Sequence, residues 1–351
     1  MLPCGMTYFL TPRIGFACKW IDRPDQVDGI RPHDDAKQLN TNGTTVAWLN
    51  RQTRDVAEQK LWDLMVWNIE SIKKLVYRVG NLPMHLRMVR LGSDILPVYT
   101  EPTWGYFWQK PDVREYAAQH LSTVGELARK QQVRLSMHPG PFVVLASVDP
   151  GIVGRSIAEF EYHVDLARWM GFGKTFQDFK INVHISGKRG PQGIKDVLQK
   201  LTPEARNCIT IENDENSWGI ESSLELANHC ALVMDVHHHW VRTSEYIMPT
   251  DDRVSRVIDS WRGVRPTMHY SVSREQWLPD HDVNQRPVMQ QLLEQGHKKQ
   301  KLRAHSNFYW NQAVNQWASE FSNSFDIMCE SKAKNLASFG FAKLCLDKNV
   351  G

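Results

Sequence analysis

The chain has 351 residues, of which 42% are hydrophobic and 23% are charged, a composition typical of globular proteins. Its formal net charge of +3 is too small to indicate a nucleic-acid-binding protein by itself. We expect neither a secreted nor a membrane protein, because the N-terminus lacks a signal-peptide pattern and no apolar run approaches the roughly 20 residues of a membrane span. The 6 cysteines are scattered without a Cys-x-x-Cys pair, which predicts free thiols in a reducing compartment, cytoplasmic or nuclear.

Short apolar runs of strand type alternate along the chain with longer segments whose apolar residues recur at helical spacing. The predicted strands cover residues 13–18, 86–91, 133–137, 180–185, 208–211, 231–234, 266–270 and 324–329. The predicted helices cover residues 58–79, 112–131, 153–171, 191–200, 221–228, 251–262 and 331–344. Two segments without clear periodicity, 21–57 and 282–323, are predicted to be long loops.

Strands that alternate with helices indicate parallel β-α-β units, and eight such units close naturally into a (β/α)8 TIM barrel. The sequence therefore predicts a single α/β barrel domain over residues 1–351, with a long loop insertion before the last strand. An open, doubly wound sheet is the alternative. It is less favoured because no Gly-x-Gly-x-x-Gly motif follows the first strand and polar residues stand at many strand ends.

A histidine or a carboxylate stands at or near the end of six consecutive predicted strands: His138, His184, Glu212, Asp235 with His238, His269 and Glu330. The C-terminal ends of the strands form the active site of a TIM barrel, so we expect these side chains to converge. Any single histidine of the set is explained as well by a hydrogen-bonded core residue. The complete set is not, because buried carboxylates are destabilising unless cations balance them.

The set holds too many ligands for one ion and predicts two or three divalent metal ions. Glu212 stands in the middle of the set and is the candidate bridge between two ions about 3.5–4 Å apart, an arrangement used for displacement at phosphorus. Carboxylate and imidazole ligands suit manganese or zinc, and magnesium also fits.

Short motifs are spread along nearly the whole chain. In chain order they are Arg13-Ile-Gly-Phe-Ala, Thr44-Thr-Val-Ala-Trp-Leu-Asn50, Arg90-Leu-Gly-Ser-Asp-Ile-Leu-Pro97, His138-Pro-Gly140, Val183-His-Ile-Ser-Gly187, Ile211-Glu-Asn-Asp-Glu215, Asp235-Val-His-His-His239, Met268-His-Tyr-Ser271 and Asp326-Ile-Met-Cys-Glu-Ser-Lys-Ala-Lys334. These motifs resemble those of the UV damage endonucleases, whose barrels are related to the zinc apurinic-site endonucleases.

The resemblance implies up to three metal ions, manganese first among them, and a nick immediately 5′ to a damaged base pair in double-stranded DNA. His138, His184 and Glu212 would hold one ion. Glu212 would bridge to a second ion, whose other ligands would be Asp235, His269 and Glu330. His238 and His281 would serve a third. Glu212, Glu330 and His238 are the expected catalytic residues, in a protein that we expect to be a monomer.

The chain departs from the pattern of this family at two positions. Where the family carries a glutamine and an aromatic residue that wedge into the duplex at the lesion, this chain has Pro141 and Phe142. An apolar side chain is sufficient to unstack a base step, so Phe142 remains the predicted wedge. Where the family has a modified lysine ligand, two residues before the seventh-strand histidine, this chain has Thr267, which leaves the third metal position open.

Further DNA contacts are predicted from residues that follow strands or lie in loops on the same face. Lys188 and Arg189 follow the fourth strand and suit a phosphate contact. In the loop at 44–50, Trp48 and Asn50 are the best candidates. The basic run at 298–303 with the aromatic residues at 308–310 has two equal interpretations, a DNA-binding segment or a solvated helix followed by packing residues.

The leading hypothesis is a metal-dependent endodeoxyribonuclease, a hydrolase of DNA repair that acts at UV-damaged or otherwise distorted base pairs. An apurinic-site endonuclease with the same metals is the second hypothesis. A metal-dependent sugar isomerase of the related barrel type is the third, and such an enzyme needs a small closed pocket. A DNA-binding protein without activity is disfavoured by the complete set of ligands.

Overall fold

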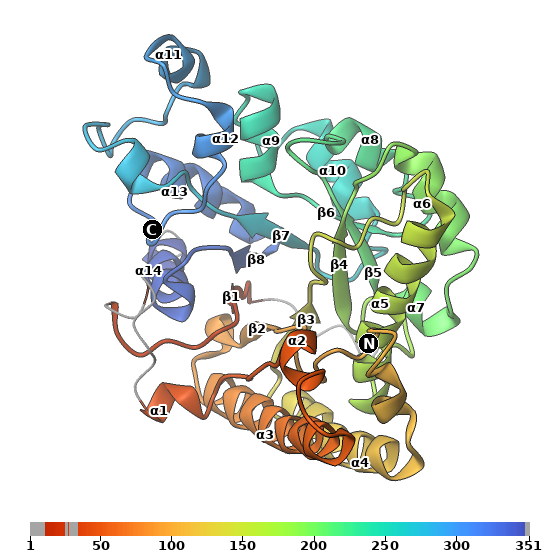
Figure 1. Ribbon diagram of the computed structural model, residues 1–351. Coiled ribbons are helices and arrows are strands. Elements are labelled where there is room, and N and C mark those ends of the chain that lie inside the picture. The colour runs from red at the N-terminus through yellow and green to blue at the C-terminus, as the bar shows by residue number, and fades with distance from the viewer. Residues whose placement is uncertain (1–10, 25–26, 28–33, 348–351) are drawn as a thin grey trace, which may run out of the picture.

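The computed structural model describes residues 11–24, 27 and 34–347, and its centre is a barrel of eight parallel strands (Figure 1). The strands are β1 (Ile14–Ala17), β2 (Met88–Leu91), β3 (Arg134–Met137), β4 (Lys180–His184), β5 (Ile209–Glu212), β6 (Ala231–Val233), β7 (Thr267–Tyr270) and β8 (Asp326–Cys329). They follow the order β6-β5-β4-β3-β2-β1-β8-β7. An isolated parallel bridge between Asp235 and His269 links the two ends, with the amide of His269 donating to the carbonyl of Met234 at 3.0 Å. The predicted TIM barrel is confirmed.

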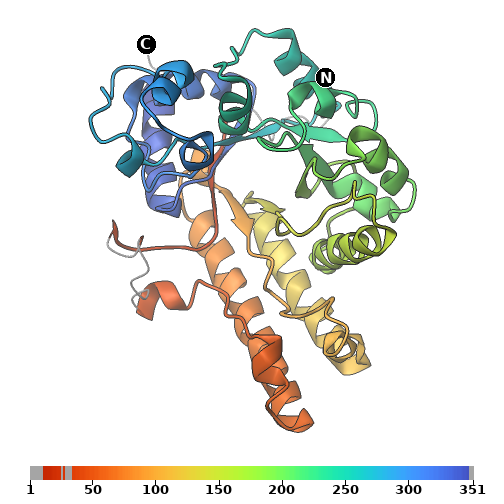
Figure 2. The ribbon, with the colours of Figure 1, turned by 45° about the horizontal axis from the view of Figure 1, so that its top comes forward.

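Helices surround the barrel, and most of them lie where the helical spacing predicts them (Figures 1 and 2). The longer ones are α3 (Arg54–Gly80), α4 (Pro111–Lys130), α5 (Pro150–Trp169), α6 (Gly190–Leu198), α9 (Val236–Thr243), α10 (Asp252–Asp259), α13 (Gln312–Ser319) and α14 (Lys334–Asp347). The short helices α7 (Pro203–Cys208) and α8 (Ile220–Leu224) flank β5. No helix in the described part of the chain is both long and apolar enough to cross a bilayer.

The two segments predicted to be long loops both contain helices. In the first lie α1 (Asp34–Lys37), α2 (Val46–Leu49) and the start of α3, whereas residues 25–26 and 28–33 lie outside the described residues. The second, 282–323, folds into α11 (Met289–Glu294), α12 (Lys299–Leu302), α13 and a 3-10 helix at 320–323. Helices of four to six residues do not persist through local spacing alone, so tertiary packing must stabilise them.

A separate hydrophobic cluster fixes α11 and α12 against α9. Its buried members are Trp240, Val241, Leu278, Met289, Leu292 and Leu302. The hydroxyl of Ser273 also donates to the carbonyl of Leu302 at 2.6 Å, directly after β7. The segment before the last strand is therefore an ordered part of the barrel face on which α9 begins.

Four strands are tied together at the opposite end of the barrel by the buried carboxylate of Asp326. Its Oδ1 accepts the backbone amide of Arg13 at 2.8 Å and Nε of Arg265 at 2.9 Å. Its Oδ2 accepts Nη1 of Arg134 at 2.6 Å. Since Arg13 precedes β1, Arg134 begins β3 and Arg265 precedes β7, this network joins both halves of the sheet at the N-terminal ends of its strands.

Candidate metal centre

Glu212 ends β5 and lies at the centre of four histidines. Its Oε2 is 3.3 Å from Nε2 of His138 and 3.7 Å from Nε2 of His184. Its Oε1 is 3.0 Å from Nδ1 of His269 and 3.5 Å from Nδ1 of His238. The side chain is fully buried. Each carboxylate oxygen of Glu212 therefore faces a different pair of imidazoles.

The orientation of Glu212 is fixed by polar side chains deeper in the barrel. Asn182 of β4 donates from Nδ2 to Oε2 of Glu212 and accepts the hydroxyl of Thr210 at 2.8 Å. Residues two apart on a strand share a face, so Asn182 and His184 both point inward, as do Thr210 and Glu212. Strand register also pairs His184 with Glu212 across the sheet.

For His138 and His184, the ring nitrogen that faces away from Glu212 has an oxygen partner. Nδ1 of His138 lies 2.8 Å from the carbonyl oxygen of Pro139. Nδ1 of His184 lies 3.2 Å from Oδ2 of Asp214. An oxygen acceptor requires the proton on Nδ1, which leaves the Nε2 lone pair directed at the centre. This is the tautomer that metal-binding histidines use, with a carboxylate or carbonyl holding the other nitrogen.

Asp235 and His238 belong to the beginning of α9, where the sequence predicted a strand exit. Asp235 is the N-cap, and its Oδ1 accepts the backbone amide of His238 at 2.7 Å. This cap places both side chains on one side of the helix start, with Nε2 of His238 3.9 Å from Oδ2 of Asp235. That Oδ2 is buried and has no hydrogen-bond partner.

The two neighbouring histidines of α9 have other surroundings. His237 stacks on Trp240, with ring centroids 5.7 Å apart. Nε2 of His239 lies 3.1 Å from Oε2 of Glu245, on the outer side of the helix start. The tract of three histidines therefore contributes one side chain, His238, to the centre.

His269 and Glu330 complete the arrangement from β7 and the end of β8. Nδ1 of His269 is 3.2 Å from Oε1 of Glu330 as well as close to Glu212. Arg90 of β2 forms an ion pair with the same oxygen of Glu330. On the far side of the imidazole, Nζ of Lys180 lies 2.9 Å from Nε2 of His269. His269 is thus held between a lysine and two carboxylates.

The side chains fall into three groups whose ligand atoms all lie within 4.8 Å of one another: His138, His184 and Glu212; Glu212, Asp235 and His238; and Asp235, His269 and Glu330. Glu212 and Asp235 each belong to two groups. Imidazole nitrogens with free lone pairs, shared carboxylates and the unpaired Oδ2 of Asp235 form a donor set suited to divalent cations. The cluster can hold metal ions.

Protons balance part of the negative charge of this cluster in the protein without ions. Burial raises the pKa of Asp235, and the charges of Glu212 and Glu330 act in the same direction. Burial alone would lower the pKa of His238, but the charges of Asp235, Glu212 and Glu215 raise it to about 10. His238 therefore carries a proton at neutral pH.

Metal binding should release protons at pH 8. A group with a raised pKa keeps its proton until the pH passes that pKa, so an ion that binds His238 must displace the proton of this imidazole at any pH below about 10. We expect the affinity for Mn²⁺ to increase from pH 7 toward pH 9. Titration calorimetry at pH 8 in two buffers of different ionisation enthalpy measures the protons directly, and equal heats in the two buffers would contradict the expectation.

The structure does not bring His281 into any of the three groups found among the described residues. Its Nδ1 lies 2.9 Å from the carbonyl of Asp282, and its ring is 6.1 Å from that of Trp310. His305, which the sequence analysis missed, lies nearer to the centre. Burial lowers its pKa, and the charges of Glu330 and His238 act on it.

Lys180 is the second residue that the sequence analysis missed. Thr267, which stands where the family has a lysine, has a buried hydroxyl without a hydrogen-bond partner, and Nζ of Lys180 approaches the imidazole of His269 from β4. Burial lowers the pKa of Lys180 to about 7. The signal was available, since Lys180, Asn182 and His184 alternate with Ile181 and Val183 and so share the inward face of the strand.

The residues predicted to contact DNA lie around the same barrel end, in loops except for Trp48, which lies in α2 where a loop was predicted. Pro141 and Phe142 are exposed in the loop after His138, with 67% of Phe142 accessible. Phe142 lines a groove of about 450 Å³ together with Gly43 and Thr44, so this loop adjoins the loop at 44–50.

The remaining predicted contacts differ in how free their side chains are. Lys188 and Arg189 are exposed after β4, and Arg189 forms an ion pair with Asp196. Trp48 is half-buried against the core, whereas Asn50 is exposed but accepts Nε1 of Trp104 at 2.8 Å. Lys188 is therefore the freest of these side chains.

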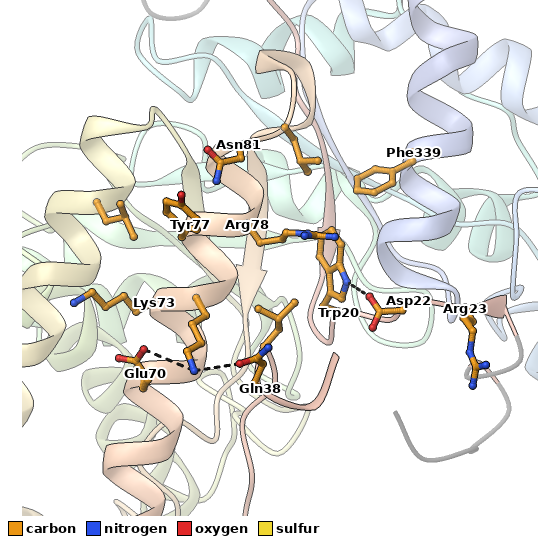
Figure 3. Close-up of a pocket in the computed structure, with 14 residues that line it drawn as sticks. Trp20, Asp22, Arg23, Gln38, Glu70, Lys73, Tyr77, Arg78, Asn81 and Phe339 are labelled. Atoms are coloured by element: carbon orange, nitrogen blue, oxygen red, sulfur yellow. Dashed lines mark hydrogen bonds and ion pairs between the residues drawn. The ribbon is translucent and has the colours of Figure 1, made fainter. Parts of the chain in front are cut away.

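A larger hollow of about 1180 Å³ lies elsewhere, between α3, α14 and residues 20, 22–23 and 38–39 (Figure 3). Several of its polar side chains interact with one another: Lys74 with Glu70 and Gln38, and Trp20 with Asp22. Arg78 covers the ring of Trp20 at 5.4 Å. No residue of the three carboxylate–histidine groups lines this hollow, so it is not part of the centre.

Comparison with known proteins finds similarity to enzymes of UV damage repair. The family model described as "UV-endonuclease UvdE" matches residues 29–349. The UV DNA damage endonuclease of Bacillus cereus (strain Q1) is 24% identical over 310 residues, which cover 85% of this chain and 86% of that protein. The UV-damage endonuclease of Schizosaccharomyces pombe is 28% identical over 226 residues, 59% of this chain but 36% of the larger relative. The crystal structure of SacUVDE has the same fold, with a TM-score of 0.66 at 21% identity over 88% of this chain and 93% of that one.

Proposed function

Since the chain belongs to the UV-endonuclease UvdE family, we propose that it is a metal-dependent endonuclease of DNA repair. It would hydrolyse the phosphodiester bond 5′ to a UV-damaged or otherwise distorted base pair. The observation that carries the proposal is the position of Glu212, whose two oxygens each face two imidazoles. This is the arrangement expected of a carboxylate that bridges two ions at a phosphodiesterase centre.

The ligands would be those of the three groups around Glu212. His138 and His184 would hold one ion with Glu212, and Asp235, His238, His269 and Glu330 would hold the others, with manganese proposed first. Divalent ions in such a centre activate the attacking water and neutralise charge on the phosphate and the leaving oxygen.

The other residues of the centre position these ligands. Asp214 orients the ring of His184. Arg90 pairs with Oε1 of Glu330, which is also the oxygen that faces Nδ1 of His269. Lys188, exposed in the loop after β4, would bind a backbone phosphate and so position the duplex over the centre. In this arrangement the protein would position the scissile phosphodiester through its phosphates and would not contact base edges. Such binding suits an enzyme that responds to distortion of the duplex more than to its sequence.

Phe142 would test the duplex for distortion by entering the base stack. Its exposed ring lies in the loop that follows His138, and apolar wedges of this kind partly unstack a base step. We expect Phe142→Ala to lower the preference for a duplex with a pyrimidine dimer over an undamaged duplex by roughly five- to hundredfold, since stacking on an aromatic side chain contributes about 1–3 kcal/mol per base. Competition binding and cleavage of the two duplexes measure the preference.

Val148→Ala is the matched control, because Val148 is an exposed apolar residue of the same connection between β3 and α5. It should leave the preference unchanged, and neither variant should change the amount of bound metal. Unaltered discrimination in Phe142→Ala would remove the residue as the wedge.

The substrate itself is tested with three duplexes, carrying a pyrimidine dimer, an abasic site or no lesion. We expect the dimer duplex to be cleaved on its 5′ side, leaving a 3′ hydroxyl. Cleavage of the abasic duplex alone would favour the apurinic-site endonuclease instead. No cleavage of any duplex with Mn²⁺ present would refute the nuclease proposal.

A further inference from the structure

A basic groove adjoins the proposed centre on the side of the segment inserted before the last strand. It has a volume of about 580 Å³ and runs between the C-terminal end of α9 and α12. Figures 1 and 2 show these two helices side by side at the barrel end on which α9 begins. Its lining contains three cations and one carboxylate: Arg242, Lys299, Arg303 and Glu215.

Glu215 connects this groove to the centre. One of its oxygens, Oε1, accepts Nη1 of Arg303 at 3.0 Å. The other, Oε2, lies 3.6 Å from Nε2 of His238. A single side chain therefore separates the groove from a proposed metal ligand, and an anion bound in the groove would lie next to the centre.

The cations of the groove keep unused donors. Arg303 donates one N–H to Glu215, and 41% of its side chain is exposed. Lys299 donates from Nζ to the carbonyl of Arg242 at 3.1 Å, which ties α12 to the end of α9. In the part of the chain that the structure describes, no ion pair joins Arg242 or Lys299 to a carboxylate. These groups are free to bind phosphate.

The groove is also held in place before any ligand binds. Leu302, the last residue of α12, is buried in the same hydrophobic cluster as Trp240 and Val241 of α9. Lys301, one residue earlier, lies on the outer side, with Nζ 4.7 Å from the ring of Trp277. The basic segment thus packs through its apolar residue Leu302 and leaves its cations on the outer side.

We propose that this α9–α12 groove binds the sugar–phosphate backbone of the DNA duplex beside the lesion. The inference rests on the proposed function, because it takes the duplex at the metal centre as the source of the phosphates. Arginine and lysine contacts to phosphate fix the register of a protein on DNA and carry no sequence information. DNA phosphates that extend from the centre past Glu215 would contact the groove cations Arg242, Lys299 and Arg303.

The test is the salt dependence of duplex binding by the double variant R242Q/K299Q, measured in EDTA so that no cleavage occurs. Each phosphate contact contributes about 0.9 to the slope of log K against log salt concentration. For R242Q/K299Q we expect the magnitude of this slope to decrease by about 2, and the affinity for the duplex to decrease by roughly tenfold or more at 0.1 M salt. The matched control is K130Q/K200Q, which removes two exposed lysines, the last residue of α4 and a residue just after α6, at the opposite end of the barrel. Its slope should equal that of the unmodified protein.

A slope in R242Q/K299Q equal to that of the unmodified protein would overturn the inference. Cleavage of the dimer duplex with Mn²⁺, measured in parallel on the unmodified protein, separates this failure from that of the proposed function. Cleavage together with an unchanged slope would refute the groove alone. A reduced slope without cleavage would refute the nuclease and support the groove.

Discussion

Replacing Glu212 by glutamine should reduce cleavage of damaged DNA by about 10³-fold or more, since bridging a metal pair contributes several kcal/mol to catalysis at phosphorus. Glutamine has nearly the same shape, but it has one oxygen in place of two and no charge. One of the two imidazole pairs around Glu212 would then face an amide nitrogen, which cannot bind a cation. We also expect the number of bound Mn²⁺ ions to fall.

Metal content by elemental analysis and single-turnover cleavage test these two expectations together. Glu225→Gln is the matched control, because Glu225 is exposed at the end of α8, outside the three ligand groups. It should retain both metal and activity. Full activity in Glu212→Gln would refute the bridging role, whereas loss of activity with unchanged metal content would limit that role to catalysis.

Replacing Asp326 by asparagine should cost about 3–5 kcal/mol in the free energy of unfolding. The carboxylate is completely buried and pairs with Arg134 and Arg265, whose side chains are each 12% exposed. Removing one partner of a buried ion pair leaves the opposite charge without compensation, and a cost of this size is typical. The loss should appear as a lower midpoint in urea denaturation with an unchanged slope.

An exposed pair supplies the comparison for Asp326. Arg168 and Glu204 lie 3.4 Å apart with 38% and 37% of their side chains exposed. Pairs at the surface contribute at most about 1 kcal/mol, so Glu204→Gln should change the stability by less than that. A similarly small change in Asp326→Asn would show that the network at the base of the barrel does not hold the strands together.

The barrel and the convergence of its histidines and carboxylates could be predicted from the sequence because one geometric rule connects them. In parallel strands the C-terminal ends all meet on one face, so a polar residue at each end is sufficient to predict convergence. The distances around Glu212 agree with that expectation for residues from β3, β4, β5 and β7. The identity of the ions has no comparable rule, because several metals accept the same ligands.

The predictions were less accurate where tertiary packing determines the local structure. Helix α9 has eight residues and contains three histidines, and it depends on the cap at Asp235 and on the burial of Trp240. An isolated antiparallel bridge with Ser273 brings His305 toward the centre, where the charges of Glu330 and His238 act on it. No periodic pattern precedes such a contact, whereas His281 was predicted from the resemblance to the UV damage endonucleases.

The most direct test of the proposed metal-dependent nuclease is cleavage of a duplex with one pyrimidine dimer by protein stripped of metal and then restored with Mn²⁺. The protein treated with chelator should bind the duplex but not cleave it. Addition of Mn²⁺ should restore a single nick at the phosphodiester 5′ to the dimer, and Glu212→Gln should not recover. Equal cleavage with and without metal, or no cleavage after restoration, would contradict the proposed centre.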